Sequence, residues 1–236
     1  MSKRKKDRKE KRRSSPPIVE FIKNLHELDI QDGHLTDTDA FALIQIAKKV
    51  AKETGPPLNF LEMGSWKGKS TICLATVTSK YPGSKIYCID HFKVNIETSE
   101  EQIAKTTDIQ TIFRNNLGLT NAKDIVCLLL MDIKDTIGLL QEKKFDLIFI
   151  DMDNRYQTML ETLKYAITLI KPGGVICGRN LVGHYPIIAK EVDEVIHKEY
   201  SQEYKIHPGI IKAVFETFGD SYKRIASSSV WYWEAL

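Results

Sequence analysis

Residues 58–71 read LNFLEMGSWKGKST, and this stretch decides the fold. Its apolar first half is typical of a buried β-strand, and Glu62 stands where that strand ends. Gly64 and Gly68 follow, and their lack of a side chain lets the backbone approach a ligand before a helix begins at Ser70. Free amide groups at such a helix N-terminus favour a carboxylate or a phosphate. The stretch therefore predicts a strand, a ligand-binding loop and a helix.

The spacing of the two glycines separates this loop from one that grips a dinucleotide. They stand four positions apart and do not form the G-x-G-x-x-G pattern of dinucleotide-binding folds. The loop is therefore wider than one that holds a pyrophosphate. Taken alone, the same residues also fit a tight strand-to-helix turn without a ligand. The acids further along the chain favour the ligand-binding alternative.

Strands and helices alternate along the rest of the chain. Apolar runs without polar alternation predict strands covered by helices on both faces, and they occupy residues 125–131, 145–151 and 174–178. An apolar stripe at helical spacing predicts a helix over residues 156–170, and two short β-like segments near the C-terminus predict an antiparallel hairpin. The pattern indicates an α/β fold: a doubly wound, mostly parallel, seven-stranded Rossmann-like sheet with an antiparallel edge hairpin and the three apolar runs at its centre.

Three parts follow one another along the chain. Residues 1–17 hold almost no apolar side chains, so we expect them to form a disordered tail. Residues 18–57 show two apolar stripes at helical spacing, the second after a plausible cap at Thr36, and they predict two N-terminal helices. Residues 58–236 form the α/β domain, and a hydrophobic content of 42% is sufficient for the core of one such domain.

The charge is unevenly distributed. Residues 3–13 hold nine Lys and Arg against Asp7 and Glu10, a net charge of +7, whereas the whole chain carries +3, so the remaining residues carry −4. A basic patch of this kind is typical of nuclear localisation or nucleic-acid binding, in which Lys and Arg release counterions from phosphates. A solvated arm without a partner is the alternative.

The cysteines and the hydropathy pattern exclude several classes of protein. The four cysteines lie in apolar runs without the CxxC or CxxH spacing of a zinc site or a redox pair, so we expect reduced core residues. No run of eighteen apolar residues occurs, and the amino terminus lacks the apolar segment of a secretory signal. We therefore expect a cytoplasmic protein that does not enter a membrane.

Three further acids stand at the ends of predicted strands: Asp90, Asp132 and Asp151. Open α/β sheets bind ligands beyond the carboxyl ends of their strands, so these acids converge on one crevice. Asp90 follows Gly64 by twenty-six positions, close to the ~20-residue spacing at which an acid meets a ribose in nucleotide-binding sheets. We expect Asp90 to accept hydrogen bonds from ribose hydroxyls, and a solvated acid at a strand end is the alternative.

The first of these motifs resembles a known family. Residues 62–71 are similar to the first motif of class I methyltransferases, in the branch often called family 24, whose pattern is roughly E-I-G-S-x-x-G-x-S-T. The resemblance continues in the expected order through residues 89–90, 131–132, 145–151 and 171–176. It implies an enzyme that binds S-adenosylmethionine and transfers its methyl group.

The resemblance also implies which residues hold the cofactor. Gly64, Ser65 and Gly68 would face the methionine part, Asp90 would hold the ribose and Asp132 the adenine edge. Asp151 would also line the reaction centre. The full set of implied cofactor-binding residues is Glu62, Gly64, Ser65, Gly68, Ser70, Asp90, His91, Asp132 and Asp151.

The chain departs from the family pattern at two strand ends. After Asp151 the family usually reads G-D-H-x-Y and this chain reads M-D-N-R-Y; after the fifth strand it usually reads G-H-D and this chain reads G-R-N. In related O-methyltransferases, acids at these strand ends bind a divalent metal that lowers the pKa of a substrate hydroxyl. Two alternatives remain here: Asp151, Asp153 and Asn180 hold Mg²⁺, or Arg179 pairs with Asp151 or Asp153 in place of the metal.

The general base is also altered. Asn154 stands where the family has a histidine, and a neutral amide does not take a proton near pH 7. His184 and His91 each follow a predicted strand, so either could overlook the crevice and deprotonate a hydroxyl, with a surface histidine as the alternative for each. We take Asp151 and His184 as the catalytic candidates. His207, just before a Pro-Gly pair, is interpreted as the start of a helix and receives no chemical role.

These features together predict an S-adenosylmethionine-dependent methyltransferase that acts on a small-molecule hydroxyl. A non-catalytic S-adenosylmethionine-binding interaction protein is one alternative, favoured by the loss of family-typical polar groups at Asn154 and Asn180. An RNA-directed methyltransferase that uses the basic tail is another. A nicotinamide-dependent oxidoreductase is disfavoured, since the glycine spacing is wrong.

Overall fold

The computed structural model describes residues 35–93, 108–120, 122–140 and 144–236. The predicted disordered tail and the first of the two predicted N-terminal helices lie outside the described residues. The second predicted helix is present, and Thr36 caps it as expected: the Thr36 Oγ1 atom accepts a hydrogen bond from the backbone N of Asp39 at 3.1 Å.

A seven-stranded sheet forms the middle layer, in the order β3-β2-β1-β4-β5-β7-β6. The strands are β1 (Asn59–Met63), β2 (Lys85–Asp90), β3 (Val126–Leu130), β4 (Phe145–Ile150), β5 (Ile170–Gly178), β6 (Lys223–Arg224) and β7 (Trp231–Glu234). The first five are parallel, whereas β7 runs antiparallel to both β5 and β6. The predicted doubly wound sheet with an antiparallel edge pair is thus confirmed.

Two details of the sheet differ from the prediction. The strand over residues 126–130 lies at an edge beside β2, not at the centre, and its side chains are only half buried or exposed. An apolar run therefore does not distinguish an edge strand from a central one when a helix covers part of it. β5 begins at Ile170, directly after the helix ends at Leu169, and not at residue 174.

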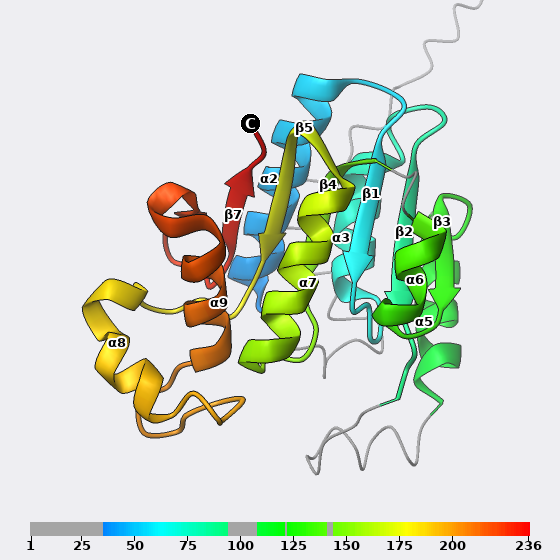
Figure 1. Ribbon diagram of the computed structural model, residues 1–236. Helices are drawn as coiled ribbons and strands as arrows, with labels where there is room; N and C mark the ends of the chain where they lie inside the picture. The colour runs from blue at the N-terminus through cyan, green and yellow to red at the C-terminus, as the bar shows by residue number, and fades with distance from the viewer. Residues whose placement is uncertain (1–34, 94–107, 121, 141–143) are drawn as a thin grey trace, which may run out of the picture.

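Helices cover both faces of the sheet (Figure 1). α2, α3 and α5 share one hydrophobic core with one face, and α6, α7 and α9 share a second core with the other. Their bounds are α2 (Asp37–Thr54), α3 (Lys69–Thr78), α5 (Ile109–Gly118), α6 (Ile133–Leu140), α7 (Tyr156–Leu169), α8 (Tyr185–Glu194) and α9 (Pro208–Phe218). β4 is buried along its whole length because it lies between these layers. No helix of the described ranges is long and apolar enough to cross a membrane.

The register brings several strand ends to one level. Met63 pairs with Ile89 on one side and with Ile150 on the other, and Ile150 pairs with Gly178. The chain that follows each of these residues therefore leaves the sheet at the same edge, which is the edge where open α/β sheets bind ligands.

Candidate functional site

The loop after β1 passes between the ends of its two neighbouring strands. The backbone N of Gly64 donates to the carbonyl of Ile89, and the backbone N of Asp151 donates to the carbonyl of Met63, each at 2.9 Å. Gly64 has a φ of +87°, and a Cβ atom there would lie only 2.1 Å from the carbonyl oxygen of Asp151. Glycine is required at this position because the backbone is left-handed and no side chain fits.

The Asp90 carboxylate shapes this loop. Its Oδ2 atom accepts hydrogen bonds from the backbone N of Ser65 and of Trp66, both at 2.8 Å, and its Oδ1 atom accepts from the backbone N of Phe92 at 2.6 Å. A carboxylate that accepts several backbone amides fixes their orientation. The sequence predicts a ribose contact for Asp90, which stays a prediction, and the structure adds this second role.

Glu62 is fully buried beneath the same loop. Its Oε2 atom accepts hydrogen bonds from Ser65 Oγ at 2.9 Å, from Thr71 Oγ1 and from Cys88 Sγ at 3.3 Å. Burial raises the pKa of Glu62 above its usual value, while the neighbouring hydroxyl groups of Ser70, Thr71 and Ser65 oppose that rise. The Oε1 atom has no hydrogen-bond partner. A buried acceptor without a partner is costly, so this oxygen is suited to a donor group of a ligand.

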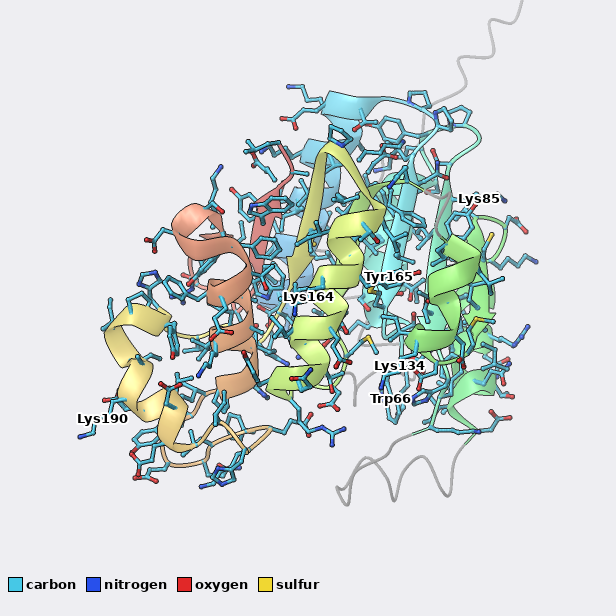
Figure 2. The ribbon with its side chains drawn as sticks, viewed as in Figure 1. Trp66, Lys85, Lys134, Lys164, Tyr165 and Lys190 are labelled. Atoms are coloured by element: carbon cyan, nitrogen blue, oxygen red, sulfur yellow. The ribbon has the colours of Figure 1, made fainter. Side chains whose placement is uncertain are left out.

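Trp66 provides an unpaired donor in the same loop. Its indole Nε1 atom is buried without a hydrogen-bond partner, and its backbone φ is +46°. Figure 2 shows Trp66 beyond the carboxyl ends of the central strands. The end of β1 and the loop after it thus provide one unpaired buried acceptor, Glu62 Oε1, and one unpaired buried donor, Trp66 Nε1. These are complementary to the ammonium and the carboxylate of an amino-acid group, so the residues present fit the methionine end of S-adenosylmethionine.

Three other predicted cofactor residues make local contacts at this edge. Gly68 precedes α3 with a φ of +89°, and a Cβ atom there would lie 3.0 Å from the ring of Phe113. The His91 Nδ1 atom accepts a hydrogen bond from the backbone N of Lys93 at 2.8 Å. Asp132 is exposed after β3 and accepts from the backbone N of Lys134 at 3.2 Å. Their predicted cofactor contacts stay predictions.

An ion pair occupies the ends of β4 and β5. The Arg179 Nε atom lies 2.6 Å from Asp151 Oδ2, and the two side chains are only 12% and 16% exposed. Arg179 Nη1 donates to Asn180 Oδ1 at 3.0 Å, and Asn180 Nδ2 donates to Asn154 Oδ1 at 3.1 Å. Arg179, Asn180 and Asn154 depart from the family pattern. Polar contacts therefore join these three side chains to one another and to Asp151.

The predicted metal donors do not fit Mg²⁺. Asp151 is paired with Arg179, Asp153 accepts from the backbone N of Arg155 at 2.9 Å and from its Nε atom at 2.6 Å, and Asn180 is bound as described above. A hard dication needs several free oxygen ligands and repels a guanidinium beside them. Among the described residues, no group of three or more His, Cys, Asp or Glu is arranged to hold a metal. Of the two alternatives, the structure favours Arg179 in place of the metal.

His184 and His207 lie at different ends of α9. His184, the predicted base, has its Nε2 atom 3.0 Å from Asp220 Oδ1, and its ring lies 5.8 Å from that of Phe215, in the C-terminal half of α9. Among the contacts of the described residues, none joins His184 to Asp151. The assignment of His184 as the base stays a prediction.

His207 precedes the other end of α9, close to the ion pair. Its Nδ1 atom lies 3.0 Å from the carbonyl oxygen of Glu199. Burial lowers the pKa of His207; the hydrogen bond to Glu199 and the charge of Asp151 raise it, and the charge of Arg179 lowers it. The sequence indicates no site role for His207, Thr71, Cys88 or Glu199. The available signal in the sequence was the Pro-Gly pair directly after His207. A glycine at the start of a helix allows a neighbouring backbone segment to pack closely against it.

A family model described as "Methyltransferase domain" matches residues 61–180. Solved structures with the same fold include an O-methyltransferase from Bacillus cereus in complex with SAH, which is 19% identical, with 93% of this chain and 90% of that chain covered and a TM-score of 0.59. They also include the O-methyltransferase TomG from Streptomyces achromogenes, involved in tomaymycin synthesis and in complex with SAM, at 14% identity, 94% and 92% coverage and a TM-score of 0.60. The SAH-bound methyltransferase PaMTH1 from Podospora anserina is 15% identical, with 91% and 84% coverage and a TM-score of 0.55. No curated protein sequence matches the chain.

Proposed function

This chain belongs to the methyltransferase-domain family, and from that premise we propose that it transfers the methyl group of S-adenosylmethionine to a hydroxyl group of a small molecule. The observation that supports this cofactor is a pair of unpaired buried atoms, Glu62 Oε1 at the end of β1 and Trp66 Nε1 in the loop that follows. When bound, S-adenosylmethionine supplies a methyl carbon that is made electrophilic by a positively charged sulfur.

The chain's own residues then bind and orient this cofactor. Glu62 Oε1 accepts from its amino group, and Trp66 Nε1 donates to its carboxylate. Asp90 holds the loop in the shape that leaves both atoms free for the ligand. Gly64, Ser65, Gly68 and Ser70 line the methionine end, Asp90 and His91 the ribose, Asp132 the adenine edge and Asp151 the reaction centre.

The reaction centre works without a metal ion in this proposal. Arg179 presents a fixed guanidinium beside Asp151, in the place where related enzymes hold a divalent cation. A positioned positive charge stabilises the oxyanion character that develops on an attacking hydroxyl oxygen. The contacts among Arg179, Asn180 and Asn154 hold this charge in position.

Two observations support oxygen as the methyl acceptor. Structures with the same fold include O-methyltransferases from Bacillus cereus and Streptomyces achromogenes. The residues after β4 read D-M-D-N-R-Y and lack the N-P-P-Y or D-P-P-Y run that enzymes acting on amino groups carry there.

Calorimetric titration with S-adenosylhomocysteine, with NAD as the comparison ligand, tests the cofactor. Methyl transfer to a library of hydroxyl compounds, measured with Mg²⁺ and with EDTA, tests the reaction. We expect S-adenosylhomocysteine binding, no NAD binding and turnover that is equal in Mg²⁺ and in EDTA. Binding without turnover on any acceptor would instead support an interaction protein, and turnover on RNA alone would support an RNA-directed enzyme. Loss of turnover in EDTA would contradict the role given to Arg179.

A further inference from the structure

We propose that His207 is the general base of this methyl transfer and takes the proton of the acceptor hydroxyl on its Nε2 atom. The inference rests on the proposed function and deepens it, since it names the group that replaces the family histidine lost at Asn154.

The backbone places His207 against the loop that follows Asp151. An antiparallel bridge between Ser201 and Ile206 closes a short turn, and His207 caps α9 immediately after it. Two residues further on, a Cβ atom at Gly209 would lie 2.4 Å from the carbonyl oxygen of Asn154 and 2.4 Å from the backbone N of Tyr156. The start of α9 is therefore packed directly on the residues that follow β4.

A single hydrogen bond defines the tautomer of the imidazole. His207 Nδ1 lies 3.0 Å from the backbone carbonyl oxygen of Glu199. A carbonyl oxygen only accepts, so Nδ1 carries the proton and Nε2 of the neutral ring holds the lone pair. No described residue forms a hydrogen bond with Nε2, which is thus available to a hydroxyl group.

The residue that orients His207 also belongs to the polar cluster at the strand ends. The Glu199 carboxylate accepts from Asn154, through the backbone N at 3.4 Å and the side-chain Nδ2 at 3.3 Å. Asn154 in turn accepts from Asn180, and Asn180 from Arg179. Glu199 therefore accepts from the imidazole through its backbone oxygen and from Asn154 through its side chain, and Asn154 is linked to Arg179 through Asn180.

Burial keeps the His207 ring neutral at physiological pH. The charges of Asp151 and Arg179, which follow β4 and β5, act on the ring, Glu199 accepts a hydrogen bond from it, and the centroid of the Tyr200 ring lies 4.9 Å from its own. Burial is the largest influence, and it moves the pKa of His207 below the usual value. The charge of Arg179 also lowers the pKa and that of Asp151 raises it. Because the pKa of His207 is lowered, at pH 7 the ring is in the form that accepts a proton.

The proposed step balances in atoms and electrons. With S-adenosylmethionine bound, the hydroxyl oxygen forms a bond to the methyl carbon while the carbon–sulfur bond breaks, the sulfur keeps the electron pair, and the hydroxyl proton goes to His207 Nε2. His207 then returns the proton to solvent before the next turnover.

His207→Gln tests the proposal, with His197→Gln as the matched control at an exposed histidine after α8. We expect His207→Gln to lower kcat about 10²- to 10⁴-fold, as for loss of a general base, with unchanged S-adenosylhomocysteine affinity. His197→Gln should stay within about threefold of the wild type. The wild-type kcat/KM should fall on the acid side with an apparent pKa below ~6.5, the unperturbed value. Thermal unfolding of both variants shows whether either loses its fold.

A second measurement does not depend on turnover. Nitrogen NMR of the histidine rings in the protein without ligand should show His207 with its proton on Nδ1 and a depressed pKa. A proton on Nε2 would overturn the proposal, as would a folded His207→Gln variant with near-wild-type kcat. A wild-type protein that binds S-adenosylhomocysteine but methylates no hydroxyl would contradict the proposed function itself, which is a distinguishable result.

Discussion

Replacing Gly64 by alanine tests the central geometric feature of the site, the close approach of the β1 loop to the end of β4. The substitution adds one methyl group, at a backbone φ of +87° and 2.1 Å from the carbonyl oxygen of Asp151. Gly173→Ala is a matched control, because Gly173 has a similar φ of +75° but its added Cβ atom would meet nothing within 4 Å.

The expected magnitude follows from two separate costs. A left-handed backbone costs alanine about 1–2 kcal/mol at either position. At Gly64 the two backbone segments must also separate by about 1 Å to reach an ordinary contact distance, and overpacking of this kind costs about 1–3 kcal/mol. We therefore expect Gly64→Ala to lose about 1–3 kcal/mol more unfolding free energy than Gly173→Ala, a further fall in Tm of about 2–4 °C per kcal/mol.

Urea unfolding and calorimetric titration with S-adenosylhomocysteine provide the two measurements. Gly173→Ala should retain full affinity because it lies away from the loop, whereas Gly64→Ala should lose at least tenfold, since Ser65 and Trp66 move with the shifted backbone. Equal stability losses in the two variants, with affinity retained in both, would refute the packing of the β1 loop against Asp151.

Three further predictions concern single groups. Glu62→Gln removes the carboxylate charge and can turn an amide donor toward the cofactor amine, so S-adenosylhomocysteine affinity should fall about 10- to 100-fold. Because burial raises the pKa of Glu62, the unfolding free energy of the wild type should fall as pH rises through that pKa, and the variant should lack this pH dependence. Arg179→Gln leaves Asp151 without its cation, so the unfolding free energy should fall by about 2 kcal/mol, less than the ~3–5 kcal/mol for breaking a fully buried pair. The variant should also lower kcat at least tenfold without a change in cofactor affinity, and unchanged kcat would contradict the role of Arg179. Deletion of residues 2–13 should leave cofactor affinity unchanged and weaken any RNA binding in a salt-dependent way, and a salt-independent loss would exclude a phosphate contact.

The sequence predicts most of the fold because local patterns carry it. The helix over residues 156–169 follows from its apolar stripe, and the strand-loop-helix from residue 58 onward follows from its glycines. The position of β3 at the sheet edge does not follow, since strand order depends on pairings between distant segments. Periodicity reports burial along one element and contains nothing about its neighbours.

The site was predictable only in part, for a related reason. Acids at strand ends are visible in the sequence, so Asp90 and Asp151 could be placed there in advance. Their partners were not all visible: the Asp90 carboxylate accepts the amides of Ser65 and Trp66 from the loop after β1. His207 lies fifty-six positions after Asp151, and only the packing of Gly209 on Asn154 brings it close. Such contacts arise from tertiary structure, and a single sequence carries no direct signal for them.

The guanidinium beside Asp151 has a consequence for the choice of acceptor. A divalent cation can be stripped by chelators or exchanged for another ion, whereas Arg179 is covalently part of the chain and keeps its charge at every physiological pH. A metal centre can also grip two neighbouring oxygens of one acceptor at once, through vacant coordination positions. Arg179 already shares its donors with Asp151 and Asn180. Under the proposed function, an acceptor with adjacent hydroxyls therefore gains no chelate advantage beside Arg179, and a compound with one hydroxyl competes with it on equal terms.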